Sequence, residues 1–278
     1  MSALPQTQAD DLLHVQDATA RLGRHVVGPF DLHLQAGQTL AILGPSGAGK
    51  STLLRLLARE LTPASGTVRF EGKPLRQWNA LDLSHRRAVL PQGFDVAFGL
   101  AADLVVALGR VGRRHDPQRD AIVQAALELA RVPQVRHRRF HTLSGGEQAR
   151  VQLARVFAQL WDVQGGLLLV DEPIAALDPG LQFELMHGLI GFARARRHAL
   201  VAVLHDINHA LAGFDRLLLV RAARQMAILP ADRSALPQLQ ALYGVRLQAV
   251  ELGEGQWATV VRPEAGADIV SMNDRAAP

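Results

Sequence analysis

A glycine-rich loop at residues 44–51 joins a short apolar run to a helical pattern. The apolar run at residues 39–43 predicts a buried strand, and the leucines within residues 53–57 recur with the period of an α-helix. A strand that ends in such a loop and continues as a helix surrounds phosphates with backbone N–H groups. Lys50 would neutralise the phosphate charge, and the Ser51 hydroxyl is suited to bind Mg²⁺. The residues expected to hold the nucleotide are Gly44, Pro45, Ser46, Gly47, Ala48, Gly49, Lys50, Ser51 and Thr52.

A second glycine-rich helix start follows downstream, at Ser144, Gly145 and Gly146. Ser144 and Glu147 have the spacing of a capping box, which satisfies free N–H groups at the start of a helix. That alternative leaves the glycines unexplained, because each costs roughly 1 kcal/mol against alanine inside a helix. A ligand close to the helix N-terminus explains them, since the helix dipole favours anions there. Two half-sites on one chain predict a protein that closes on ATP by pairing with a second copy.

Two further apolar runs end in polar residues that suit a metal–phosphate site. Residues 167–170 lead into Asp171 and Glu172, and residues 199–204 lead into His205. At the end of a buried parallel strand, Asp171 could hold Mg²⁺ and Glu172 could orient the attacking water. The alternative is that both acids cap the next helix. His205 could hydrogen-bond the γ-phosphate, although a single histidine is more often structural.

The order of the patterns predicts an α/β fold with a mainly parallel sheet, because apolar strand runs alternate with helical segments. Helices are expected at residues 121–132, after a start signal at Asp116 and Pro117, and at residues 183–197. We expect a core from 12–92 and 144–239 that includes an antiparallel β subdomain, a helical subdomain at 93–143, a C-terminal β extension at 240–265, and loose ends at 1–11 and 266–278.

Composition excludes some classes of protein. The chain has no cysteine, so it has neither disulfides nor thiolate metal sites, which fits a reducing compartment. Its longest apolar runs are too short to cross a bilayer, which needs about 20 residues. Arginines cluster at residues 110–114 and 131–139. These clusters could meet phosphates of nucleic acid or lipid or an acidic partner, or they could form a solvated surface.

Taken in order, these motifs resemble the ATP-binding cassette (ABC) ATPases, from about residue 12 to residue 239. The resemblance adds Gln92, in a Leu90-Pro91-Gln92 setting, and a loop that ends at Asp178. It implies a P-loop NTPase (RecA-like) core and catalytic roles for Lys50, Gln92, Glu172 and His205. It also implies Mg²⁺ held by Ser51, Gln92 and Asp171.

The same resemblance implies a head-to-tail homodimer with two ATP molecules. Each would be held by Lys50 of one copy and by Ser144 and Gly146 of the other. Gly145 and Asp178 are also expected to bind the nucleotide. Gln92 would link the nucleotide to the helical lobe, whose groove would receive a coupling helix from a membrane permease.

Finer features are similar to the importers for iron chelates, haem and vitamin B12. They are residues 106–110, 154–161 and 203–208, and residues 154–161 most resemble the haem-import ATPases. Two transmembrane permease subunits, an indirect periplasmic binding protein, and a peripheral place on the cytoplasmic face of the bacterial inner membrane are implied. Ferric siderophore or cobalamin import is the alternative. A soluble cassette that acts on nucleic acid would need tandem cassettes or coiled-coil arms, so no nucleic-acid partner is expected, and a nucleotide kinase has no use for Ser144 to Gly146.

Two positions depart from the family pattern. Where many members place an aromatic residue that stacks on adenine, this chain has Arg21-Leu22-Gly23. The base would then contact aliphatic atoms or Arg21, which puts selectivity for adenine in question. Ile174 replaces a small polar residue after the two acids, a change that we expect to be tolerated.

Overall fold

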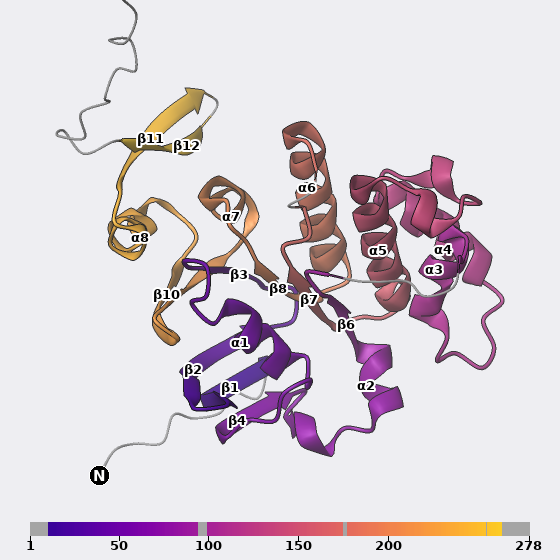
Figure 1. The fold of residues 1–278 in the computed structure, drawn as a ribbon, viewed down its shortest axis with the longest axis horizontal. Helices are drawn as coiled ribbons and strands as arrows, with labels where there is room; N and C mark the ends of the chain where they lie inside the picture. Colours follow the sequence, from indigo (N-terminus) through magenta and orange to yellow (C-terminus); the bar gives the residue numbers. More distant parts are fainter. Residues whose placement is uncertain (1–10, 94–98, 175–176, 254, 263–278) are drawn as a thin grey trace, which may run out of the picture.

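The computed structural model describes residues 11–93, 99–174, 177–253 and 255–262. Its centre is a six-stranded sheet in the order β10-β9-β3-β8-β7-β6 (Figure 1). The strands are β3 (Thr39–Leu43), β6 (Arg87–Leu90), β7 (Leu167–Asp171), β8 (Ala199–Val203), β9 (Arg216–Arg221) and β10 (Arg224–Pro230). Neighbours are parallel except β9 with β10. This sheet confirms the predicted α/β core, and the carboxyl ends of β3, β7 and β8 meet at one edge.

The sheet separates two hydrophobic cores. Leu168 and Val170 of β7 pack with α5 (Gly145–Leu160) and α6 (Pro179–Ala195), whereas Leu167 and Leu169 pack with α1 (Lys50–Leu57). Successive side chains of a strand point to opposite faces, so one apolar run serves both cores. Figure 1 shows α5 and α6 on one side of the sheet and α1 on the other.

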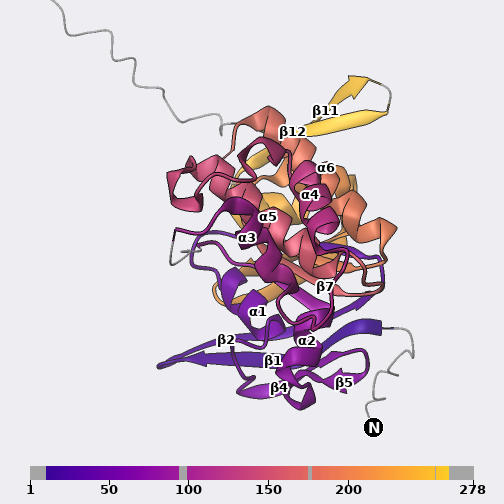
Figure 2. The same ribbon diagram turned by 90° about the vertical axis from the view of Figure 1, so that its right-hand side faces the viewer.

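An antiparallel sheet packs beyond α1 (Figure 2). Its strand order is β2-β1-β4-β5, with β1 (Asp11–Leu22), β2 (His25–Gln35), β4 (Ser65–Phe70) and β5 (Lys73–Pro74). Its apolar face completes the core under α1, with Phe30 and Phe70 fully buried. The β1–β2 hairpin therefore stands next to the glycine-rich loop.

Helix α7 (Ile207–Gly213) packs beside α6, and the other helices lie toward the two ends of the central sheet (Figure 1). At one end are α2 (Ala80–Arg86), α3 (Ala102–Ala107) and α4 (Arg119–Leu129), and α3 and α4 pack on α5. At the other are α8 (Leu236–Tyr243) and a hairpin of β11 (Arg246–Gly253) and β12 (Gln256–Arg262). Short 3₁₀ turns are η1 (Leu75–Gln77), η2 (Leu108–Arg110), η3 (Pro133–Val135), η4 (Phe140–Thr142) and η5 (Arg233–Ala235). None of the helices in the described ranges is long and apolar enough to cross a membrane.

Helix α6 begins earlier than predicted. It starts at Pro179 rather than at Phe183. The Asp178 side chain accepts a hydrogen bond from the Leu181 backbone N–H at 3.1 Å and so caps the helix. Proline suits the first helical position, because its missing N–H would have no partner there. The predicted start was wrong because the cap was overlooked.

Helix α4 (Arg119–Leu129) begins two residues before the predicted range of 121–132 and ends three residues before its end, and the proposed start signal at Asp116 does not cap it. Its first residue is Arg119, and Gln118 stands at the N-cap without a side-chain hydrogen bond to the helix. Asp116 is not available as a cap because both of its carboxylate oxygens accept hydrogen bonds from Arg110. A residue type that often caps helices is used here for an ion pair.

Candidate nucleotide site

The glycine-rich loop between β3 and α1 is packed closely against two other strands. A β-carbon at Gly44 would lie 2.1 Å from the carbonyl oxygen of Val220 in β9. Gly49 has a φ of 103°, and a β-carbon there would lie 2.7 Å from Cγ1 of Val27 in β2. Both positions therefore require glycine. Helix α1 starts at Lys50, within the glycine-rich loop as the sequence defines it.

The Lys50 side chain organises the loop from inside. Its Nζ donates to the carbonyl oxygens of Gly44 at 2.8 Å and Pro45 at 3.1 Å. Lys50 is only 6% exposed. Burial lowers the pKa of its ammonium group, and the carboxylates of Glu172 and Asp171 offset part of this effect. The buried cation therefore lies near both acids that were predicted to belong to the same site.

A cavity of about 360 Å³ lies over the loop. It is lined by Ser46, Gly47, Ala48, Gly49, Lys50, Ser51, Thr52, Gln92, Glu172 and His205. The structure thus brings together residues from four separate parts of the chain that the sequence placed in one site. Gly44 and Pro45 do not line this cavity, and their carbonyl groups bind Lys50 instead.

Asp171 ends β7 beside the loop and is 6% exposed. Burial raises the pKa of its carboxyl group, and a hydrogen bond with the Ser51 side chain and the charge of Lys50 counteract part of that rise. Its Oδ1 is buried and has no hydrogen-bond partner among the described residues. An unpaired buried carboxylate oxygen is costly unless something else binds it. Asp171 therefore presents one oxygen next to Ser51 that is suited to a cation.

Glu172 lies at the centre of a three-residue contact. Its Oε2 accepts a hydrogen bond from Gln92 Nε2 at 2.8 Å, and its Oε1 contacts His205 Nε2. Asp171 and Val203 are paired in the parallel register of β7 and β8, so the residues just beyond each strand meet at one edge. Glu172 has a φ of 51°, a left-handed conformation that a non-glycine residue adopts rarely. Such backbone outliers are frequent at functional sites.

The second glycine-rich motif, Ser144, Gly145 and Gly146, forms the start of α5. The Ser144 Oγ accepts from the Glu147 N–H at 3.2 Å, and the Glu147 carboxylate accepts from the Ser144 N–H at 2.8 Å. The capping box is therefore present. A β-carbon at Gly145 would meet no atom within 4 Å. No contact within the described chain requires glycine at position 145.

Ser144, Gly146 and Asp178 do not line the cavity over the phosphate loop. Gly145 lines a second cavity, of about 210 Å³, together with Gln92, Asp171 and Glu172. Asp178 caps α6. In the predicted loop Ala176-Leu177-Asp178, the Leu177 N–H donates to the Ile174 carbonyl at 3.1 Å, and Ala176 lies outside the described residues. The residues over the phosphate loop are therefore assembled within one chain. Of the second half-site, Gly145 shares a cavity with Gln92, Asp171 and Glu172, whereas Ser144, Gly146 and Asp178 line neither cavity.

The strand pairing in the β1–β2 hairpin decides which side chains face the phosphate loop, next to the place expected for the adenine base. Leu22 pairs with His25 and Arg21 pairs with Val26. Alternate residues share a face, so Leu22 and His25 lie on the same face as Val27, which packs against the phosphate loop. Arg21 lies on the opposite face. The sequence pattern alone did not single out His25, because only the strand pairing places it opposite Leu22.

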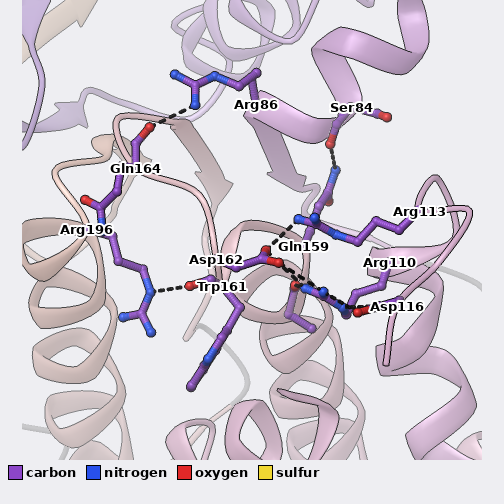
Figure 3. A network of polar contacts seen from close by, with 11 residues as sticks. Ser84, Arg86, Arg110, Arg113, Asp116, Gln159, Trp161, Asp162, Gln164 and Arg196 are labelled. Carbon is purple, nitrogen blue, oxygen red and sulfur yellow. Dashed lines mark hydrogen bonds and ion pairs between the residues drawn. The ribbon is translucent and has the colours of Figure 1, made fainter. Parts of the chain in front are cut away.

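Part of the first arginine cluster is buried inside the protein (Figure 3). Arg110 is 3% exposed and donates to Asp116, to Asp162 and to the Ala158 carbonyl at 3.0 Å. Arg113 donates to Asp162 at 2.6 Å. The expectation that this cluster could meet external phosphates is wrong for Arg110, because burial and two carboxylates consume its donors.

The other departure from the family pattern has a simple place in the fold. Ile174 is 7% exposed and packs in the larger core. An apolar side chain at this position fills space between the end of β7 and the helices that cover it.

Comparison with known proteins gives the family directly. A family model described as ABC transporter matches residues 27–175. The chain is 42% identical over 223 residues to the hemin import ATP-binding protein HmuV of Pseudomonas entomophila. The aligned region covers 79% of this chain and 87% of that protein. It is 44% identical over 200 residues to HmuV of Methylobacillus flagellatus, with 70% and 74% covered.

Solved structures show the same fold. An inward-facing ABC transporter of the metal-chelate type superimposes with a TM-score of 0.75 at 23% identity, over 92% of this chain and 99% of that one. A dimeric ATP-binding cassette in a post-hydrolysis state, bound to ADP and Pi, superimposes with a TM-score of 0.69 at 24% identity, over 79% of this chain and 98% of that one. The chain therefore belongs to the ABC transporter family, as one of its ATP-binding and ATP-hydrolysing P-loop cassettes.

Proposed function

We propose that this chain is the ATPase subunit that energises an importer of haem. The observation that carries the ATPase role is the convergence of Lys50, Gln92, Glu172 and His205 on one cavity over the phosphate loop. The observation that favours haem is the identity of 42% and 44% to hemin import ATP-binding proteins over most of the chain. In this proposal ATP binding closes two copies of the chain on each other, and hydrolysis reopens them.

The residues around Asp171 fit a magnesium ion. The unpartnered Asp171 Oδ1 and the Ser51 hydroxyl are oxygen donors of the kind that Mg²⁺ prefers. Gln92 donates through Nε2 to Glu172, so Oε1 is the atom that it can offer to a cation. A bound Mg²⁺ would neutralise phosphate charge there. Ser51, Asp171 and Gln92 are thus the proposed ligands.

The proposed hydrolysis depends on how Glu172 is held. Its two oxygens contact Gln92 and His205 from either side, which fixes the carboxylate at the cavity wall. In that place it can orient a water and accept its proton. Lys50 would exchange its hydrogen bonds to the loop carbonyls for phosphate oxygens. Since phosphoryl transfer needs chiefly positioning and charge stabilisation, this arrangement supplies its main requirements.

The second half-site is proposed to act on the ATP of another copy. Ser144, Gly145 and Gly146 begin a helix of 16 residues, α5. Free N–H groups and the dipole at such an end attract anions. The open space at Gly145 supports this role, because nothing within the described chain explains the missing side chain. Asp178 would approach from the same partner.

The base is proposed to contact Leu22 and His25. Both lie on the same face of the β1–β2 hairpin as Val27, which packs against the phosphate loop, whereas Arg21 lies on the opposite face. A histidine ring and a leucine side chain would together replace the aromatic ring found in many relatives. Stacking on Arg21, one of the two options expected from the sequence, is not favoured by this register.

The proposed assembly has two copies of this chain and two permease subunits, on the cytoplasmic face of the bacterial inner membrane, with a periplasmic binding protein that delivers cargo to the permease. The proposed boundaries are a core at 12–92 and 144–239, a helical lobe at 93–143 and an extension at 240–265. A nucleic-acid partner is not favoured, because several clustered arginines pair with acids of the chain itself, as Arg131 does with Glu184 and Arg138 with Glu147.

Transport in vesicles tests this proposal. Co-purification from membranes identifies the permease, and ATP-driven uptake then compares haem, cobalamin and a ferric siderophore. We expect haem uptake that requires ATP and stops with Glu172→Gln, which keeps the size of the side chain and removes its charge. Uptake of cobalamin or siderophore without haem would assign the alternative cargo. Failure to associate with any membrane protein, together with salt-sensitive binding to RNA or DNA, would overturn the transport role.

A further inference from the structure

The side chain of Asn208 forms three hydrogen bonds with a single residue of the C-terminal hairpin. Its Nδ2 donates to the Thr259 carbonyl at 3.1 Å, and its Oδ1 accepts from the Thr259 N–H at 2.7 Å and from the Thr259 hydroxyl at 2.8 Å. The amide thus pairs with both backbone groups of Thr259, as a neighbouring strand would. Thr259 is 7% exposed, so these polar groups depend on this contact.

Asn208 belongs to the short helix that directly follows His205. Helix α7 has seven residues, too few to be stable by itself in water. Its N-cap is Asp206, which accepts hydrogen bonds from the backbone N–H groups of Asn208 and His209. The position of α7, and of the residue before its cap, is therefore set by contacts with other elements. The Asn208–Thr259 contact lies in its first turn.

The hairpin that carries Thr259 is itself held to the body of the protein. A two-stranded hairpin is at best marginally stable alone. Leu247 of β11 is buried in the larger core, and Arg233 lies over the Trp257 ring at 5.1 Å. Strand β11 contacts α8 and strand β12 contacts α7, so both strands of the hairpin are held to the body of the protein.

We propose that Asn208 is a positioning residue for His205. By binding Thr259 it fixes the start of α7, and this holds the His205 ring against the Glu172 carboxylate. The C-terminal extension is then part of the scaffold of the hydrolytic site. This inference rests on the proposed function of Glu172 and His205. It gives a role to Asn208, which the proposed ATP site does not use.

Two substitutions and one matched control test the proposal. Asn208→Leu removes all three hydrogen bonds, and Thr259→Val removes only the one from the hydroxyl. Gln240→Leu is the control, because Gln240 Oε1 also accepts a backbone hydrogen bond from the hairpin, from the Leu247 N–H at 2.9 Å, and this bond joins the hairpin to α8 rather than to α7. We expect Asn208→Leu to lower kcat between about 10-fold and 100-fold with KM for ATP unchanged, since misplacement near the reacting groups acts on turnover. Thr259→Val should lower kcat less, and Gln240→Leu should leave it near wild type.

Histidine resonances give a readout that needs no ATPase activity. In protein labelled with ¹⁵N-histidine, the His205 ring is assigned with His205→Ala. Its signals should move in Asn208→Leu, move less in Thr259→Val and stay in place in Gln240→Leu. Unchanged His205 signals in both Asn208→Leu and Thr259→Val, or equal effects of Gln240→Leu, would overturn the proposal. If Asn208→Leu does not fold, Thr259→Val decides. Absence of ATPase activity in the wild type would count against the proposed function, and the resonances would still report the positioning.

Discussion

Replacing Arg110 with methionine should destabilise the protein far more than replacing its neighbour Arg113. The Arg110 guanidinium binds both oxygens of Asp116, both oxygens of Asp162 and the Ala158 carbonyl (Figure 3). Its side chain is 1% exposed and that of Asp116 is 11% exposed. Arg110→Met therefore leaves a nearly buried carboxylate without its partner.

The size of the effect follows from the burial of each group. Removing one partner of a buried ion pair typically costs about 3–5 kcal/mol. The Asp162 side chain is 38% exposed and can be solvated, so the lower end, about 3 kcal/mol of unfolding free energy, is expected. Arg113 pairs with Asp162 at the surface, and Arg113→Ala should cost about 0–1 kcal/mol, as surface pairs do.

Urea unfolding at neutral pH, followed by circular dichroism, measures both losses. The double substitution Arg110→Met with Asp116→Asn removes the stranded charge and should recover part of the lost stability. Equal losses for Arg110→Met and Arg113→Ala, or no recovery in the double variant, would refute the reasoning. The outcome also matters for the second half-site, because Arg110 binds the carbonyl of Ala158 near the end of α5, the helix that begins at Gly145.

Three further predictions concern pH, the phosphate loop and the base. The hydrogen bond from Arg110 lowers the pKa of Asp116, so this pair stabilises the fold above the unfolded pKa of about 3.9, and its contribution falls as pH drops through the lower folded pKa. Urea unfolding at falling pH should show a steeper loss in wild type than in Arg110→Met, and parallel curves would contradict this. Gly44→Ala forces a β-carbon toward a carbonyl oxygen 2.1 Å away, which should cost about 1–3 kcal/mol and weaken ATP binding in calorimetry; an unchanged Kd would contradict the close packing. His25→Ala should reduce ATP affinity more than Arg21→Ala in the same assay, and the reverse order would refute the assignment from strand register.

Local sequence patterns were enough to predict those parts of the site in which a strand, a loop and a helix follow one another along the chain. The apolar run before Asp171 is buried on both faces in the structure, and a parallel neighbour brings Glu172 to His205. The edge where these residues meet could be predicted because parallel strands present their carboxyl ends together.

Contacts between distant segments could not be predicted in this way. Nothing in the local sequence around Asp116 indicates that it binds Arg110 rather than capping α4. Asn208 and Thr259 are 51 residues apart, and only tertiary structure pairs them. The face of the hairpin on which Leu22 and His25 lie depends on the strand register, and a one-residue shift of a strand would move its side chains to the opposite face.

The most direct measurement is the mass in solution of Glu172→Gln with ATP and Mg²⁺, by analytical ultracentrifugation. If two copies close on ATP through Lys50 of one and Ser144 of the other, this slowly hydrolysing variant should sediment as a dimer with ATP and as a monomer without it. Adding Ser144→Arg should restore the monomer. A preparation that binds ATP and remains strictly monomeric, even with its permease supplied, would contradict the proposed pairing of half-sites.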